Sequence, residues 1–235
     1  MKKCFEKNGF ALSEEQEEKL KKYYQLLVSY NKKVNLTSVT EEEEVWRVHF
    51  FDSALLLTGG LGGGLSSREG IRVLDVGSGA GFPGMVLAIL RPDWEFVLLD
   101  SLGKRVDFLN LVSKELELKN VRATHGRAEE LARENDYREG FDLVVSRAVA
   151  ELRLLLELCV PFVKNDGVFV SYKGPKYQEE IAAAENAMKE LVCRKAKVHS
   201  FCLDGNERFL LEISRAGELP ERYPRRTGVP ARRPL

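Results

Sequence analysis

The sequence predicts a doubly wound α/β fold, with a mostly parallel seven-stranded sheet and a small helical N-terminal extension. From residue 71 onward, short β-branched runs alternate with longer helical stretches, a pattern typical of parallel βαβ units. Only residues 204–207 separate the last two runs, which indicates an antiparallel hairpin. The first run leads directly into a glycine-rich turn, the place where sheets of this kind bind ligands.

Two helices are expected in the N-terminal extension. Ser13 and Gln16 have the spacing of a capping box, and apolar residues recur behind them at helical intervals, which predicts a helix over 13–32. Thr40 and Glu43 repeat this spacing and predict a second capped helix behind them.

Glycine occupies five of the nine positions from 59 to 67, a composition typical of a flexible linker. This run predicts a domain boundary. We expect four parts in the chain, namely a helical N-terminal extension (1–58), a Gly-rich linker (59–70), a ligand-binding sheet domain (71–214) and a basic C-terminal tail (215–235).

Alternation of apolar runs and helical spacing defines the elements of the sheet domain. The strands are expected at 72–76, 96–100, 121–125, 141–146, 168–173, 197–203 and 208–213. The helices between them are expected at 83–91, 104–118, 128–136, 151–161 and 176–193.

The composition is that of a soluble globular protein, with 44% hydrophobic and 31% charged residues. The longest apolar run covers only residues 85–90, so no membrane span is predicted. No apolar stretch follows the N-terminal lysines, which argues against a signal peptide and favours a cytoplasmic protein. The four cysteines are scattered, so neither a zinc site nor a disulfide framework is expected. We expect a monomer.

Positive charge gathers at the C-terminus although the whole chain balances 36 basic and 36 acidic residues. Residues 220–235 contain five arginines and a single glutamate, together with four prolines that oppose a long helix. This composition predicts an extended, exposed tail that binds an anionic partner.

The glycine-rich turn after the first strand is the strongest functional signal. Gly77 and Gly79 allow the backbone to turn tightly and approach a ligand, and Asp75 precedes them within the strand. Gly79, Gly81 and Gly84 also fit the fingerprint of dinucleotide-binding sites, so a dehydrogenase is an alternative.

Two features argue against a nicotinamide cofactor. The glycine run begins early, at Gly77, and a carboxylate at Asp75 would repel a pyrophosphate. A ligand with an ammonium and a sulfonium group would instead be attracted to Asp75. S-Adenosylmethionine is such a ligand, and we expect it as the cofactor, in contact with Asp75, Gly77 and Gly79.

Charged residues follow the other strands. Asp100 could accept hydrogen bonds from the ribose hydroxyls or could cap the next helix. Glu129 could meet the adenine amino group or act as a first-turn acid of its helix. Arg147 and Lys173 could contact phosphates or form surface ion pairs. The three histidines are far apart and are interpreted as structural.

Seven stretches in this order resemble the bacterial RsmG family, also called glucose-inhibited division protein B. They are YNKKVNLT (30–37), HFFDS (49–53), LDVGSGAGFPG (74–84), LDSLGKR (99–105), GRAE (126–129), VSRA (145–148) and RYPRRTGVP (222–230). The glycine motif alone would indicate only a class I methyltransferase with a Rossmann-like sheet. The N-terminal motifs and the arginine-rich tail motif are specific to this family.

The resemblance implies an S-adenosylmethionine-dependent methyltransferase that acts on N7 of a guanine in 16S ribosomal RNA, either free or in a small-subunit precursor. Carried over position by position, the cofactor contacts are Gly77, Phe82, Asp100, Ser101, Ala128, Glu129 and Arg147. Guanine N7 has a lone pair and no proton, so no proton-transfer residue and no metal are expected.

We further expect phosphates of the RNA to be held by cations on the ligand side of the sheet and by the tail. These residues are Arg147, Lys173, Arg222, Arg225 and Arg226. Two alternatives of other classes stay open, a nicotinamide-dependent oxidoreductase and an RNA-binding module without activity. The first lacks a substrate domain after residue 214, and the second does not explain the glycine loop.

Overall fold

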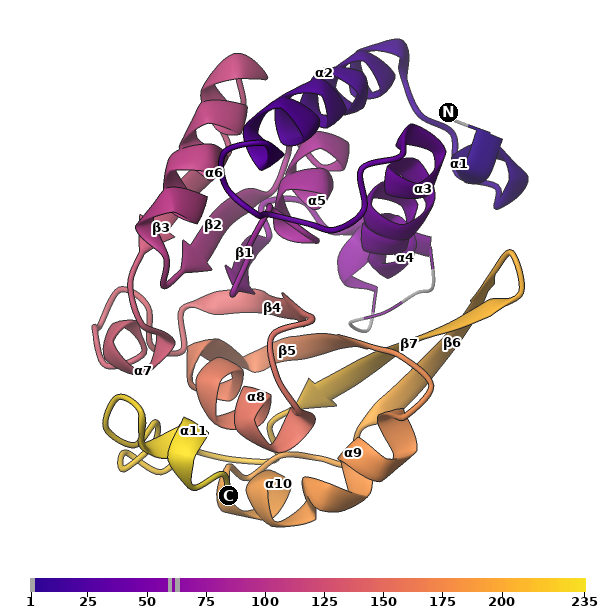
Figure 1. Cartoon of the computed structure of the whole chain (residues 1–235). Helices are drawn as coiled ribbons and strands as arrows, with labels where there is room; N and C mark the ends of the chain where they lie inside the picture. The colour runs from indigo at the N-terminus through magenta and orange to yellow at the C-terminus, as the bar shows by residue number, and fades with distance from the viewer. Residues whose placement is uncertain (1–2, 59–60, 62–63) are drawn as a thin grey trace.

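A single seven-stranded sheet between two layers of helices organises the protein (Figure 1). The computed structural model describes residues 3–58, 61 and 64–235. The strands are β1 (Arg72–Val76), β2 (Glu95–Asp100), β3 (Val121–His125), β4 (Phe141–Arg147), β5 (Val163–Lys173), β6 (Lys197–Leu203) and β7 (Asn206–Ser214).

The sheet has the strand order β3-β2-β1-β4-β5-β7-β6. β1 to β5 pair in parallel, and β7 pairs antiparallel with both β5 and β6. The predicted strands, their mostly parallel arrangement and the terminal hairpin are therefore confirmed. Because the strand order reverses between β1 and β4, the carboxyl ends of these two strands border the expected ligand site.

The helices are α1 (Lys3–Lys7), α2 (Glu14–Asn31), α3 (Glu42–Val45), α4 (Asp52–Thr58), α5 (Gly84–Leu90), α6 (Gly103–Glu115), α7 (Ala128–Leu131), α8 (Leu152–Cys159), α9 (Tyr177–Ala183), α10 (Glu185–Glu190) and α11 (Val229–Arg232). A π-helical segment (Trp46–Phe51) joins α3 to α4, and 3₁₀ turns cover Leu65–Ser67 and Val160–Phe162. Within the described ranges, no helix combines the length and the apolar character that a membrane crossing needs.

The capping box at the start of α2 is confirmed. The Gln16 backbone N–H donates to the Ser13 hydroxyl over 3.2 Å, and the Ser13 N–H donates to the Gln16 side chain over 3.0 Å. The cap predicted at Thr40 is wrong, because the N-cap residue is Glu41 and it makes no side-chain hydrogen bond to the helix. Here the helix begins without a capping side chain.

Two predicted helices are shorter than their patterns. The helix expected over 128–136 ends at Leu131, and the chain then turns so that Tyr137 packs against Phe141 in the core. The helix expected over 176–193 is divided into α9 and α10, because Ala184 has φ −96° and ψ 2° and leaves the helical conformation.

The N-terminal helices share one apolar core with the sheet. Tyr23 of α2 stacks on Phe50 of the π-helical segment with ring centroids 5.3 Å apart, and it also contacts Phe82 and Phe108. α2 lies across α5 and α6 in Figure 1. The division at the Gly-rich linker stays a prediction, and four of its residues, 59, 60, 62 and 63, lie outside the described residues.

Candidate active site

The glycine loop between β1 and α5 has a backbone that only glycine adopts readily. Gly77, Gly79 and Gly81 have φ values of 75°, 59° and 98°. A side chain on Gly81 would also lie 2.5 Å from the Tyr23 hydroxyl, which donates a hydrogen bond to the carbonyl of Ala80. The N-terminal extension therefore holds this loop from one side.

Asp100 ties the glycine loop to the end of β2. Its carboxylate accepts the N–H of Gly79 over 2.9 Å through one oxygen and the N–H of Leu102 over 2.9 Å through the other. Leu102 is the N-cap residue of α6, so Asp100 supports the start of this helix while its side chain, 2% exposed, still faces the ligand cleft.

Two adjoining cavities flank the glycine loop. The larger, of about 510 Å³, extends over the loop to Phe82, His49 and Arg147, and the smaller, of about 200 Å³, extends toward Ala128 and Glu129. Both are lined by Gly77, Asp100, Ser101 and Val149. An elongated ligand could cross from one cavity to the other over the end of β2.

Asp75 lies beneath the loop rather than in the cleft. Its side chain is fully buried, accepts the N–H of Gly84 over 2.9 Å through Oδ2 and leaves Oδ1 without a hydrogen-bond partner. Burial raises the pKa of this carboxyl to about 7. We expected Asp75 to face the ligand, but it lines neither cavity, because the hydrogen bond from the Gly84 N–H holds its side chain beneath the loop.

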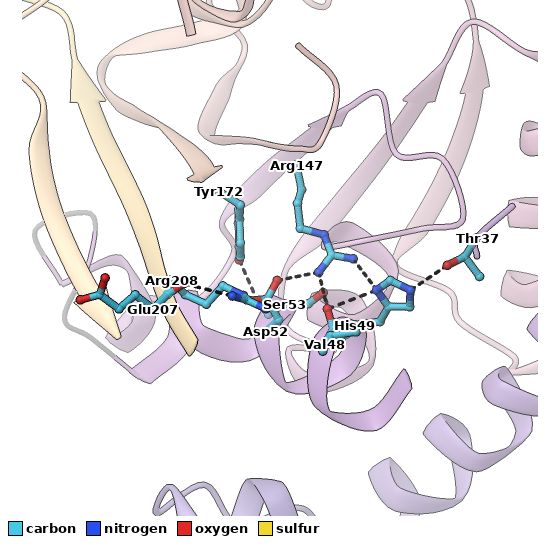
Figure 2. A network of polar contacts seen from close by, with 9 residues as sticks. All are labelled: Thr37, Val48, His49, Asp52, Ser53, Arg147, Tyr172, Glu207 and Arg208. Atoms are coloured by element: carbon cyan, nitrogen blue, oxygen red, sulfur yellow. Dashed lines mark hydrogen bonds and ion pairs between the residues drawn. The ribbon is translucent and has the colours of Figure 1, made fainter. Parts of the chain in front are cut away.

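Arg147, at the end of β4, is the centre of a polar network (Figure 2). Its guanidinium donates to Asp52 over 2.7 Å and to the carbonyl of Val48 over 3.1 Å, and it lies 3.2 Å from His49 Nδ1. The His49 ring stacks on Phe82 with centroids 4.5 Å apart, and the Arg147 guanidinium lies 5.1 Å from the centre of the Phe82 ring. The side chain of Arg147 is only 13% exposed.

The π-helical segment aims residues of the extension at this network. The carbonyl of Val48 and the ring of His49 come from this segment, and Asp52 follows it directly. π-Helical turns inside α-helices often occur at functional sites. Thr37 contacts His49 Nε2 over 2.9 Å, so the loop before α3 also reaches the cleft.

A third cavity, of about 520 Å³, lies beside Arg147 over the ends of β4 and β5. Asp52 lies at its edge and accepts a second hydrogen bond from Arg208 of β7 over 3.0 Å. Lys173 also lines it, but its side chain is paired with Glu180 over 2.6 Å and is largely buried. Val149 belongs to all three cavities and therefore stands where they meet.

The C-terminal tail is not the extended, exposed segment that its composition predicts. It folds back on the sheet domain, Tyr223 is buried, and Arg225 pairs with Glu157 of α8. Arg222 binds Glu190 of α10 over 2.6 Å and is 66% exposed, while Arg226 is also exposed. The correction has a simple cause, since buried and half-buried carboxylates of the domain attract these arginines. The phosphate contacts expected of them stay a prediction.

Sequence reasoning missed four contributors to the site. The sequence pattern interprets the histidines, His49 among them, as structural, and it does not single out Tyr23, Asp52 or Arg208 as site residues. His49 and Asp52 do lie in one of the stretches that resemble the RsmG family, which was the available signal. Within the described residues, no group of three or more His, Cys, Asp or Glu side chains could hold a metal ion.

Solved structures of other proteins share this fold. An S-adenosylmethionine-dependent O-methyltransferase of Thermotoga maritima matches 83% of the chain and 73% of its own, with a TM-score of 0.56 and 13% identity. The structure of MtNAS in complex with MTA and tNA covers 86% of this chain and 74% of its own chain, with a TM-score of 0.58 and 13% identity. The sheet, its strand order and the glycine loop define a class I methyltransferase fold.

The particular family follows from sequence comparison. A family model described as rRNA small subunit methyltransferase G, or GidB, matches residues 16–210. Ribosomal RNA small subunit methyltransferase G of Streptococcus pyogenes serotype M3 is 42% identical over 235 residues, which cover 99% of this chain and 97% of that protein. The counterpart from serotype M12 is 41% identical over the same length. The chain belongs to the GidB family.

Proposed function

We propose that the protein transfers a methyl group from S-adenosylmethionine to N7 of a guanine in 16S ribosomal RNA, free or within a small-subunit precursor. The observation that carries this proposal is the left-handed glycine loop, tied to Asp100 between two cavities that share Gly77 and Ser101. Membership of a family whose relatives are named ribosomal RNA small subunit methyltransferase G supports the substrate.

The residues present fit this cofactor. Asp100 would accept hydrogen bonds from the ribose at the boundary between the two cavities, and Ala128 and Glu129 would border the adenine in the smaller one. The methionine part would then lie along Gly77 and Gly79 in the larger cavity, whose far end is closed by Phe82. In this arrangement Arg147 stands between the cofactor and the third cavity.

The third cavity is the proposed place of the target base. It combines the aromatic side chains of Tyr172 and Phe209 with polar groups at Asp52 and Arg208, and it adjoins the cofactor cleft at Val149. Of the cations expected to hold phosphates, Arg222 and Arg226 are the exposed ones.

When bound, S-adenosylmethionine supplies an electrophilic methyl group. Guanine N7 is a proton-free acceptor, so no side chain has to remove a proton from it. The contribution of this chain is to hold N7 in line with the methyl group and to exclude water, an effect worth up to about 7–11 kcal/mol.

Mass spectrometry of 16S ribosomal RNA tests the proposal. RNA or small subunits from cells that lack the gene, incubated with the protein and S-adenosylmethionine, should gain one methyl group on a guanine, and the modified base should behave as 7-methylguanine. Absence of methylation on both free RNA and small subunits would contradict the proposed function, and a methyl group elsewhere would contradict the atom.

Asp100→Ala should weaken S-adenosylmethionine binding about 10- to 150-fold, since hydrogen bonds to a charged group contribute about 1.5–3 kcal/mol. Calorimetry on the native protein and on the variant gives this ratio, and NAD should bind to neither. Asp100→Ala also frees the N–H groups of Gly79 and Leu102, so its thermal stability should fall as well. A loss of stability with unchanged cofactor affinity would leave Asp100 as a helix cap only.

A further inference from the structure

We propose that the C-terminal segment, residues 222–235, is a positioning element of the cofactor site that closes the adenine end of the cleft and orients Glu129. The inference rests on the proposed function, since it takes the adenosine of the cofactor as the occupant of the smaller cavity. It assigns to Arg225 a role within the protein rather than on the RNA, and it leaves the exposed Arg222 and Arg226 as the candidates for phosphate contacts.

A buried ion pair anchors the segment. Glu157 of α8 is 0% exposed, and both of its carboxylate oxygens accept hydrogen bonds from Arg225. The backbone N–H of Arg225 donates to the same carboxylate over 2.8 Å, and its guanidinium also donates to the carbonyl of Arg233 over 2.8 Å. Arg225 therefore fastens the tail to α8 and, at the same time, holds the two ends of the segment together.

The helix that holds the anchor also borders the cavity. Leu154 and Leu158 of α8 line the smaller cavity. Leu154 lies one turn before Glu157, the partner of Arg225, and Leu158 lies directly after Glu157. Ala231 of α11, on the tail itself, lines the same cavity. The segment is thus one of its walls, and α11 is held there by the pairing of Arg225 with Glu157.

The segment also makes direct contact with Glu129. Gly228 has φ 77°, and its N–H donates to Glu129 Oε1 over 2.9 Å. Thr227 donates to the neighbouring Glu130 over 3.0 Å. The Arg127 guanidinium lies 3.6 Å from the same oxygen, so the tail and Arg127 together orient the Glu129 carboxylate.

Further contacts hold the start of the segment. Arg138 donates to the carbonyl of Tyr223 over 2.7 Å, and Arg133 donates to the carbonyl of Pro224. These donors come from the chain after α7, whose first turn carries Glu129. The tail, α7 and α8 therefore form one connected unit around the adenine end of the cleft.

The charges of the segment favour this role over RNA binding for Arg225. A guanidinium that satisfies a fully buried carboxylate is neutralised in the protein, and removing it would leave that carboxylate unpaired. The adjacent Arg226 is exposed and carries the same charge. Comparing variants of Arg225 and Arg226 therefore distinguishes a positioning role from a phosphate contact.

The test compares Arg225→Met with the matched control Arg226→Met. Calorimetry with S-adenosylhomocysteine should show affinity about tenfold weaker for Arg225→Met and unchanged for Arg226→Met, as expected for a disturbed hydrogen bond to a charged group. In the methylation assay, Arg225→Met should raise KM for S-adenosylmethionine and leave both kcat and KM for RNA nearly unchanged.

A second variant keeps the proposal testable if Arg225→Met does not fold. Ala231 is exposed and lines the cavity, so Ala231→Phe should leave the melting temperature unchanged and weaken S-adenosylhomocysteine binding. The proposal is overturned if Ala231→Phe binds normally, or if Arg225→Met raises KM only for RNA. Failure of the native protein to bind S-adenosylhomocysteine would instead count against the proposed function.

Discussion

Arg147→Ala is expected to lower kcat/KM for RNA methylation by about 30- to 5,000-fold, since truncating one partner of a buried, hydrogen-bonded charge pair costs about 2–5 kcal/mol. Arg147 holds Asp52 and the carbonyl of Val48, and it covers the face of Phe82. Its loss disturbs the wall between the cofactor cleft and the third cavity. A methylation assay with a melting curve for each variant measures the effect.

The matched control is Arg208→Ala, which removes the other guanidinium bound to Asp52. Its side chain is more exposed than that of Arg147 and lies outside the cofactor cleft, so we expect a smaller loss. The pKa of His49 is a second readout. Burial and, after it, the positive charge of Arg147 lower this pKa to about 4. In Arg147→Ala an NMR titration should find this pKa raised. Equal activity losses in the two variants would argue against a special role for Arg147.

Asp75→Asn should change how the stability of the protein depends on pH. In the folded protein the pKa of Asp75 is about 7, against 3.8 for an ordinary aspartate. Between these values the unfolded chain releases the proton and the folded protein keeps it, so this group makes the native protein less stable as pH rises through the window. Since each pKa unit corresponds to about 1.4 kcal/mol, the full change is about 4 kcal/mol.

Urea unfolding at several pH values from 5 to 8 measures this effect. Asparagine has no proton to lose. The free energy of unfolding of the variant should therefore rise relative to that of the native protein as pH rises toward 7, and the difference should level off above pH 7. Asp93→Asn is the control, because hydrogen bonds from Arg91 lower the pKa of Asp93 and nothing titrates there above pH 5. Parallel curves for native protein and Asp75→Asn would contradict the raised pKa.

Local signals were enough to predict the sheet and the glycine loop. The central parallel strands β1, β2 and β4 are largely apolar because both of their faces are covered, and such runs are visible in the sequence. The loop needs three glycines within five residues, and Asp100 is fixed by its place at a strand end. These features depend on residues that are close in the chain.

The rest depends on residues that meet only after folding. Asp52 binds Arg147 and Arg208, which follow it by 95 and 156 positions in the sequence. No sequence pattern around these three residues predicts the contacts. The composition of the tail predicts exposure because its carboxylate partners, Glu157 and Glu190, lie on helices far upstream and are not part of the local sequence.

The aromatic cluster that joins α2 to α6 has a consequence for how the chain is made. Tyr23 and Tyr30 of α2 pack against Phe108 of α6, and Tyr30 reaches it with ring centroids 5.0 Å apart. At about 5–20 residues per second, translating the 78 positions from Tyr30 to Phe108 takes roughly 4–16 s. Until Phe108 has been made, the rings of α2 can pack only within the N-terminal extension, as Tyr23 does on Phe50, and the contact with α6 forms after this delay.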